Sequence, residues 1–176
     1  MTDYMTRAKA IKMVVFDVDG VLTDGSLFLG DDGQEYKAFN SRDGHGMAML
    51  RQSGITMAVI TGRQSEVVRI RMESLGVEYI YQGRRDKRPA YAELRQACGL
   101  EHAQIAYMGD DVVDLPVMRQ VGLAIAVADA HPLVKQYCHW QTRLPGGAGA
   151  AREVCEGLLA AQGKLDALFA GYASSS

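Results

Sequence analysis

The hydrophobic positions of this 176-residue chain fall into short runs that are bounded by loop residues. Five mainly apolar runs predict buried strands, at residues 13–16, 55–60, 77–81, 104–108 and 123–128. Between these runs lie four segments with helical spacing, several of which end at a glycine, at residues 46–54, 65–76, 90–100 and 114–122. Alternation of apolar strands with helices is typical of a parallel sheet that is covered on both faces. We therefore predict a doubly wound α/β fold.

Two segments depart from this alternation. Residues 26–39 alternate between apolar and polar positions around a central Asp-Asp-Gly, which predicts a β-hairpin inserted after the first strand. A lone hairpin is only marginally stable, so we expect it to pack against the domain or against another subunit. Residues 145–176 predict a glycine-rich hinge followed by an amphipathic helix and a tail. The length suits one domain, which we assign to residues 1–176.

Composition and charge exclude several classes of protein. The chain is 48% hydrophobic and 23% charged with a formal net charge of −2, so we expect no dominant basic face for nucleic acid. Cys98, Cys138 and Cys155 lack the spacing of a zinc site, and we interpret them as reduced structural residues. No apolar run approaches the roughly 20 residues of a membrane helix. Residues 1–12 lack the apolar segment of a secretory signal, and we therefore expect a cytoplasmic protein.

Polar residues follow four of the predicted strands. Parallel strands end at the same edge of a sheet, where ligands of such folds bind. The four clusters are Asp17 with Asp19, Thr61 with Gly62 and Arg63, Asp86 with Lys87, and Asp110 with Asp111 and Asp114. Scattered surface charge would not follow strand ends so regularly. We expect a single site that is assembled from four loops.

The crowded aspartates of these loops predict a divalent metal ion. Clustered carboxylates repel one another, and burial raises the pKa of at least one of them unless a cation neutralises the group. Oxygen ligands without histidine or cysteine favour Mg²⁺, which takes its remaining ligands from water and phosphate oxygens. We therefore expect a phosphorylated substrate, whose oxygens accept hydrogen bonds from Lys87, from the Thr61 hydroxyl and from backbone N–H groups beside Gly20 and Gly62.

The nucleophile of such a site is best assigned to a carboxylate. The strand-end loops contain no Ser-His or Cys-His pair, and an aspartate can form an aspartyl-phosphate intermediate. Asp17 directly follows the first strand and is the better placed of the first two acids. Asp19 can protonate the leaving alkoxide and then deprotonate the attacking water.

Four sequence motifs, in this order, resemble those of the haloacid dehalogenase superfamily of phosphatases: DVDGVLTDG, TGR, DK and GDDVVD. Further segments, such as KAFNSRDGHGMAML, YQGRRDK and GGAGAAREVCEGLLAAQGKL, are similar to the small 3-deoxy-D-manno-octulosonate (KDO) 8-phosphate phosphatases along nearly the whole chain. The resemblance implies hydrolysis of KDO 8-phosphate to KDO and phosphate, a late step in making the inner sugar of Gram-negative lipopolysaccharide. It also implies Mg²⁺, a homotetramer, and a hairpin where larger relatives carry a cap domain.

The resemblance also implies roles for individual residues. Asp17 is the nucleophile and a metal ligand, and Asp19 is the acid and base whose backbone carbonyl also binds the metal. Asp110 is a further metal ligand, while Thr61 and Lys87 hold the phosphate.

The remaining implied roles concern residues around this group. Asp111 and Asp114 orient Lys87 or metal-bound waters, and Gly62 lies against the substrate. Arg71 reaches the substrate carboxylate of an adjacent subunit. Relatives that act on nine-carbon sialic-type acid phosphates tend to carry an acidic residue where Arg63 stands here, which favours the KDO sugar.

Other interpretations stay open at this point. A phosphatase for a nine-carbon acid 9-phosphate fits the same motifs. A receiver-like phosphoacceptor domain shares the chemistry, but it carries its acidic pair first, its phosphorylated aspartate at a later strand, and then its Thr and Lys. In this chain a second acidic cluster follows Thr61 and Lys87. A non-catalytic oligomerisation partner is a third alternative. Asp114 taken alone could simply cap a helix, and we assign no role to any of the four histidines.

Overall fold

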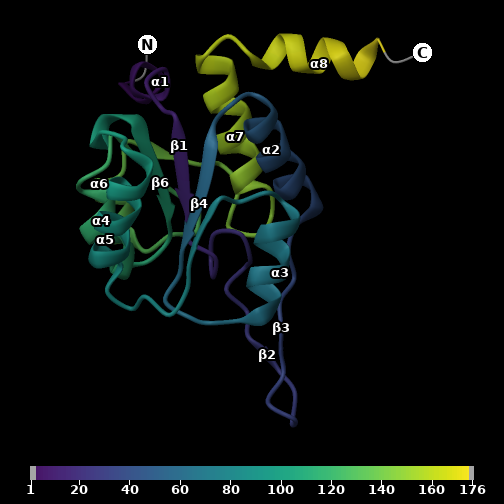
Figure 1. The fold of residues 1–176 in the computed structure, drawn as a ribbon, viewed down its shortest axis with the longest axis vertical. Helices are drawn as coiled ribbons and strands as arrows, with labels where there is room; N and C mark the ends of the chain where they lie inside the picture. The colour runs from purple at the N-terminus through teal and green to yellow at the C-terminus, as the bar shows by residue number, and fades with distance from the viewer. Residues whose placement is uncertain (1–2, 175–176) are drawn as a thin grey trace.

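A six-stranded parallel sheet forms the centre of the protein (Figure 1). The computed structural model describes residues 3–174. The strands are β1 (Met13–Phe16), β4 (Thr56–Ile60), β5 (Tyr79–Tyr81), β6 (Ile105–Gly109), β7 (Leu123–Ala126) and β8 (Trp140–Gln141), in the spatial order β5-β4-β1-β6-β7-β8. Every neighbouring pair is parallel, and the predicted doubly wound sheet is confirmed. The two-residue strand β8 was not predicted, because it is too short to form an apolar run.

Strand β1 lies between β4 and β6 and determines where the polar loops meet. Its four residues are all buried, since helices cover both faces of the sheet. Phe16, the last residue of β1, pairs in register with Val59 of β4 and Met108 of β6. The chain runs from β1 to β4 and β5 in one direction, and then returns to β6, β7 and β8 on the other side. The residues that follow β1, β4 and β6 therefore share the edge at which such folds bind ligands.

Helices form a layer on each face of the sheet (Figure 1). One layer contains α2 (Ser41–Gln52), α3 (Glu66–Ser74) and α7 (Ala150–Ala161). The other contains α4 (Lys87–Cys98), α5 (Leu115–Met118) and α6 (Pro132–Tyr137). Two short 3₁₀ turns, η1 (His102–Gln104) and η2 (Val112–Asp114), precede β6 and α5. The predicted helix at 114–122 is thus a 3₁₀ turn followed by a single α-helical turn.

Two helices begin earlier than the apolar pattern predicts because polar residues cap them. Asn40 accepts a hydrogen bond from the backbone N–H of Arg42 at 2.9 Å, so α2 begins at Ser41 rather than residue 46. Asp86 accepts one from the backbone N–H of Arg88 at 3.1 Å and starts α4. Lys87, which we expected in a loop, is therefore the first residue of a helix.

The hairpin projects from the end of the molecule where β1 finishes (Figure 1). It consists of β2 (Phe28–Leu29) and β3 (Glu35–Tyr36), which pair antiparallel. Phe28 is 54% exposed and Leu29 is 65% exposed, so these apolar side chains do not pack on the domain of their own chain. In the described part of the chain, the hairpin is the only sheet element between β1 and α2.

The glycine-rich segment, which we predicted to be a hinge, packs closely against the loop that follows β1. The backbone N–H of Gly147 donates to Val21 at 3.0 Å, and that of Gly146 donates to the Asp129 carboxylate at 3.0 Å. A Cβ atom at position 146 would overlap the carbonyl oxygen of Gly20. Asp43 of α2 then accepts a hydrogen bond from the backbone N–H of Arg152, which ties the start of α7 to α2. The segment therefore supports the loop that follows β1.

The helices at the two ends of the chain were not predicted. These are α1 (Asp3–Ala8) and α8 (Leu165–Ala173), and α8 extends from the body at the end opposite the hairpin (Figure 1). No residue of α8 is buried. Within residues 3–174, none of the helices has both the length and the apolar character needed to cross a bilayer. The expected domain of residues 1–176 includes residues 1–2 and 175–176, which lie outside the described residues.

Replacing Gly146 by alanine should lower the free energy of unfolding by about 1–3 kcal/mol, which is the usual cost of overpacking. The reason is that one of two backbone segments must move to admit the methyl group. Urea denaturation measures the loss. Gly171→Ala in α8 is the matched control, because a Cβ atom there meets no other atom within 4 Å. Equal stability of the two variants would contradict the packed arrangement.

Candidate active site

A cavity of about 1040 Å³ opens at the edge of the sheet where β1, β4 and β6 end. Residues that the sequence analysis selected make up much of its wall: Asp17, Asp19, Gly20, Thr61, Gly62, Arg63, Lys87, Asp110 and Asp111. The wall also contains Gln64, Arg85 and Asp129, which the sequence analysis did not select. The loops after four different strands therefore meet at one cavity, as their positions in the sequence predict.

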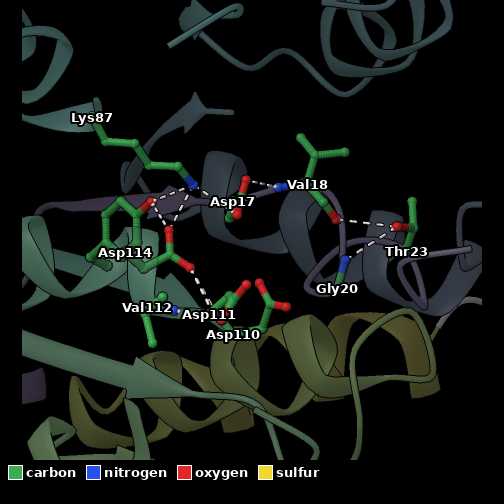
Figure 2. A network of polar contacts seen from close by, with 10 residues as sticks. Asp17, Val18, Gly20, Thr23, Lys87, Asp110, Asp111, Val112 and Asp114 are labelled. Atoms are coloured by element: carbon green, nitrogen blue, oxygen red, sulfur yellow. Dashed lines mark hydrogen bonds and ion pairs between the residues drawn. The ribbon is translucent and has the colours of Figure 1, made fainter. Parts of the chain in front are cut away.

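Lys87 joins the loops that follow β1 and β6. Its Nζ lies 2.7 Å from a carboxylate oxygen of Asp17 and 2.6 Å from one of Asp114. Figure 2 shows these three side chains pointing toward one another. The side chain of Lys87 is 1% exposed and that of Asp114 is 0% exposed, so solvent does not reach the contact between them. Buried charges of this kind stay in place only while the Lys87 ammonium and its two carboxylates all keep their partners.

Asp114 is hydrogen bonded at both of its carboxylate oxygens. One accepts from Lys87 and, at 2.7 Å, from the hydroxyl of Tyr107 in β6. The other accepts from the backbone N–H groups of Asp110 at 3.0 Å and Asp111 at 3.2 Å. Asp114 therefore fixes both the Lys87 ammonium and the turn that carries Asp110. Tyr107 was missed because a tyrosine within an apolar run has the pattern of an ordinary core residue.

Asp111 lies in a different environment from Asp114. Its side chain is exposed and accepts a hydrogen bond from the backbone N–H of Val112 at 2.7 Å, which caps the turn η2. The contacts of Lys87 are with Asp17, Asp114 and Tyr107, and they do not include Asp111. Of the two residues expected to orient Lys87 or metal-bound waters, the structure brings only Asp114 to Lys87.

The electrostatics of the cluster reflect crowded negative charge. Burial and the charge of Asp114 raise the pKa of Asp17 to about 6, although Lys87 acts in the opposite direction. Burial together with Asp114 and Asp17 raises the pKa of Asp110 to about 8. Burial alone would lower the pKa of Lys87, but Asp17 and Asp114 raise it overall, so the lysine stays charged. One ammonium does not balance three carboxylates.

The donor set fits a hard divalent cation such as Mg²⁺. Asp17, Asp110 and Asp114 each offer a carboxylate oxygen within 4.8 Å of the others. One oxygen of Asp110 is buried and has no hydrogen-bond partner among the described residues. Because Asp114 is already bonded at both oxygens, Asp17 and Asp110 are the carboxylates best able to bind a cation. A Cβ atom at Gly20 would overlap the Asp110 carboxylate, so glycine is needed for this close approach.

The loop after β1 is held by a residue that the sequence analysis did not select. The hydroxyl of buried Thr23 accepts a hydrogen bond from the backbone N–H of Gly20 at 3.4 Å and lies 3.4 Å from the carbonyl oxygen of Val18 (Figure 2). It also accepts one from the backbone N–H of Gly25 at 3.2 Å. The Asp17 carboxylate accepts from the backbone N–H of Val18 at 2.7 Å. These bonds fix the turn that presents Asp17 and Asp19 to the cavity.

The hairpin contributes charged residues that contact two residues of the cavity wall, Asp19 and Arg63. Lys37, just after β3, forms an ion pair with Asp19 and a second one with Glu35, at 2.8 Å. A hydrogen bond from Lys37 lowers the pKa of Glu35. Glu35 in turn lies 3.4 Å from the Nε atom of Arg63. Neither Lys37 nor Glu35 was selected from the sequence, because alternation in a hairpin does not tell which face meets the domain.

The other predicted residues occupy separate positions. Thr61 is buried at the cavity wall beside Gly62, and its backbone N–H donates to Tyr81 at 2.9 Å. Arg71 belongs to α3, and its guanidinium lies against α2, where a Cβ atom at Gly44 would overlap it. Arg71 does not line the cavity of its own chain. No histidine is among the described residues that line the cavity.

Comparison with known proteins decides the family. The profile of the haloacid dehalogenase-like hydrolases matches residues 77–152. The 3-deoxy-D-manno-octulosonate 8-phosphate phosphatase of Yersinia pestis is 49% identical over 164 residues, which cover 93% of this chain and 88% of the relative. The chain belongs to this phosphatase family. The phosphatase of the same name from Escherichia coli K12 is 47% identical over 93% of this chain and 87% of its own length.

Solved structures of the family have the same fold. A probable YrbI family phosphatase from Pseudomonas syringae superposes with a TM-score of 0.98 and 50% identity, and the match covers 100% of both chains. The KDO 8-phosphate phosphatase of Moraxella catarrhalis superposes with a TM-score of 0.95 and 41% identity over 98% of this chain and 99% of that one. That structure is a complex with a magnesium ion, a phosphate ion and KDO. The predicted haloacid dehalogenase type of fold is confirmed.

Asp110→Asn should raise the thermal unfolding midpoint of the metal-free protein, because it removes a buried carboxylate whose ionisation the neighbouring acids oppose. The same variant should lose the stabilisation by Mg²⁺ that we expect for the unsubstituted protein, which reaches about 2.7 kcal/mol at a hundredfold excess over Kd. Differential scanning fluorimetry over a Mg²⁺ series measures both effects, with NaCl at matched ionic strength as the control. Equal Mg²⁺ responses of the two proteins would contradict a site at Asp110.

Proposed function

We propose that this protein is a Mg²⁺-dependent phosphatase that hydrolyses KDO 8-phosphate to KDO and inorganic phosphate, in the synthesis of lipopolysaccharide precursors. The observation that carries the proposal is the buried contact of Lys87 with Asp17 and Asp114, beside an Asp110 oxygen that has no hydrogen-bond partner in residues 3–174. The Yersinia pestis relative bears the name of this activity and is 49% identical to the chain. The cavity and the charge pattern suit a phosphorylated acid.

In the first step, Asp17 acts as the nucleophile. One of its carboxylate oxygens attacks the phosphorus atom, and the bond between phosphorus and the sugar oxygen breaks. Asp19, in its protonated form, gives a proton to the departing sugar oxygen, so that KDO leaves as an alcohol. The product of this step is an aspartyl phosphate on Asp17.

In the second step, water releases the phosphate. Asp19, now a carboxylate, takes a proton from the water as its oxygen attacks phosphorus and the bond to the Asp17 oxygen breaks. Asp17 returns as a carboxylate and inorganic phosphate leaves. Asp19 distinguishes this cycle from that of a phosphoacceptor domain. Such a domain requires a long-lived aspartyl phosphate, and a neighbouring acid and base would promote its hydrolysis.

The remaining residues hold the reacting phosphoryl group. Lys87 supplies charge to its oxygens, and Asp114 and Tyr107 keep the ammonium in place. The Thr61 hydroxyl and the backbone beside Gly62 supply hydrogen bonds.

Residues of the cavity wall would hold the metal ion. Asp17, Asp110 and the backbone carbonyl of Asp19 would be its protein ligands. A bound Mg²⁺ ion neutralises the carboxylates and the phosphoryl oxygens, which allows two anions to approach each other.

Arg63 is the residue that we propose contacts the sugar acid. It stands at the cavity wall directly after Thr61 and Gly62, and its side chain is 44% exposed, so its guanidinium can reach a substrate carboxylate. An acidic residue at this position would repel the same group. The choice of an eight-carbon over a nine-carbon acid rests on this charge and on the similarity to the named relatives.

We further propose that the protein is a cytoplasmic homotetramer. The exposed apolar residues Phe28 and Leu29 of the hairpin would be covered by a neighbouring subunit, and Arg71 would reach that neighbour's substrate. The hairpin projects from the end of the molecule at which β1 finishes (Figure 1), and its residue Lys37 contacts Asp19 of the cavity wall, which supports a site that is closed by another copy of the chain. The three cysteines are free thiols, which fits a reducing compartment.

A substrate panel tests the proposed activity. Among eight-carbon and nine-carbon keto-acid phosphates and a hexose phosphate, KDO 8-phosphate should give the highest kcat/KM in a phosphate-release assay, and EDTA should abolish turnover. Asp17→Asn should lower kcat by about 10³-fold or more, because the nucleophile is lost. The control Asp166→Asn, on an exposed position of α8, should keep full activity. Preferential turnover of the hexose phosphate, or an active Asp17→Asn enzyme, would contradict the proposal.

A further inference from the structure

Lys37 connects the hairpin to the catalytic loop. Its Nζ contacts the carboxylate of Asp19 and lies 2.8 Å from that of Glu35. The Lys37 side chain has 0% exposure, whereas the two carboxylates retain 22% and 14%. Lysine is almost never fully buried unless it is paired. In residues 3–174, the ion pair with Lys37 is the only polar contact seen for the Asp19 carboxylate.

This arrangement leaves the orientation of Asp19 dependent on Lys37. Asp19 follows the last residue of β1 by three positions and is half-buried, so the sheet itself does not hold its side chain. Thr23 fixes the backbone of the loop but does not contact the Asp19 carboxylate. Breaking a buried pair by removing one partner is costly, because the other charge is left without compensation.

We propose that Lys37 is a positioning residue, which holds the Asp19 carboxylate toward the cavity for the hydrolysis of the aspartyl phosphate. The inference rests on the proposed function, since it assigns Lys37 to the residue that activates water there. Lys37 therefore acts through Asp19 in the second step, in which the water proton moves to Asp19 and the bond between phosphorus and the Asp17 oxygen breaks.

The hairpin gains a function from this assignment. Glu35 contacts the same ammonium and also lies 3.4 Å from Arg63, so the strand β3 reaches both the catalytic loop and the loop after β4. A movement of the hairpin would move Lys37 and with it Asp19. The hairpin, which stands where larger relatives carry a cap domain, therefore also positions a residue of the catalytic loop.

The substrate p-nitrophenyl phosphate separates the two steps. Its leaving group is a stable anion that needs no proton, so the first step with this substrate does not depend on Asp19. The second step is the same for every substrate and does depend on Asp19. Since kcat/KM reports the steps up to release of nitrophenolate and kcat includes the hydrolysis of the intermediate, the two parameters report on different steps.

Lys37→Met should lower kcat for p-nitrophenyl phosphate by about 10- to 100-fold, a substantial part of what a positioned base contributes. Its KM should fall by a similar factor, so that kcat/KM stays within about twofold of the parent value. Rapid mixing should show a burst of about one nitrophenolate per active site before the slow steady state. Lys9→Met, which makes the same change at an exposed lysine, is the control and should alter neither parameter.

Two further variants keep the inference testable if Lys37→Met unfolds. Lys37→Arg keeps the charge but moves the donor atoms, and we expect the same separation of kcat from kcat/KM with a smaller loss. In an Asp19→Asn enzyme, the further change Lys37→Met should lower kcat by less than about twofold. The carboxylate through which Lys37 acts is already lost in that enzyme. Thermal unfolding of each variant establishes that it is folded.

The outcomes for this inference and for the proposed function can be told apart. A parallel fall of kcat and kcat/KM without a burst would indicate a purely structural role and overturn the inference, as would unchanged kinetics. A parent enzyme that hydrolyses p-nitrophenyl phosphate but not KDO 8-phosphate would overturn the proposed substrate and leave this test valid. A parent enzyme that hydrolyses neither would overturn both.

Discussion

The buried contact of Lys87 with Asp17 and Asp114 is the interaction on which the rest of the site depends. Two carboxylates and an ammonium have been removed from water, which is favourable only when every member is paired. Asp114 satisfies this condition through Tyr107 and two backbone N–H groups. Asp110, at the edge of the group, keeps one oxygen that has no hydrogen-bond partner in the part of the chain that the structure describes. The core of the network is therefore complete in the protein alone. The outer part has a remaining affinity for a cation.

The sheet topology brings these charges together, and close backbone packing keeps them in place. Because β1 lies between β4 and β6, the loops that follow these strands converge without any further domain. The turn after β1 is tied by Thr23 and supported by the glycine-rich segment through Gly146, which leaves no space for a side chain. The hairpin contacts residues of the wall through the ion pairs of Lys37 with Asp19 and of Glu35 with Arg63. The loop that carries Asp17 is thus held by contacts on two sides. This suits a reaction in which the Asp17 oxygen must approach phosphorus in line with the bond that breaks.

Sequence patterns were sufficient for much of the fold and for the residues that end strands. Asp17, Lys87 and Asp110 were found because a charged residue after an apolar run of a parallel sheet has a defined location. Tyr107 and Lys37 were not found, since the first lies within an apolar strand and the second in a hairpin whose inward face depends on tertiary contacts. The sequence does not distinguish Asp111 from Asp114, because both are aspartates that follow the same strand. The turn η2 directs Asp111 to solvent and Asp114 to Lys87. The packing of the glycine-rich segment was not predicted, because glycine permits close packing as well as flexibility, and its role as a hinge stays a prediction.

The central claim is that Asp17 accepts the phosphoryl group, and trapping the intermediate tests it most directly. Rapid quenching of the enzyme with a phosphate monoester, followed by borohydride, reduces an aspartyl phosphate to homoserine, which peptide mass spectrometry locates in the chain. The account predicts homoserine at position 17, with none in samples that lack substrate. Modification at another carboxylate, or an unmodified Asp17 during active turnover, would contradict it.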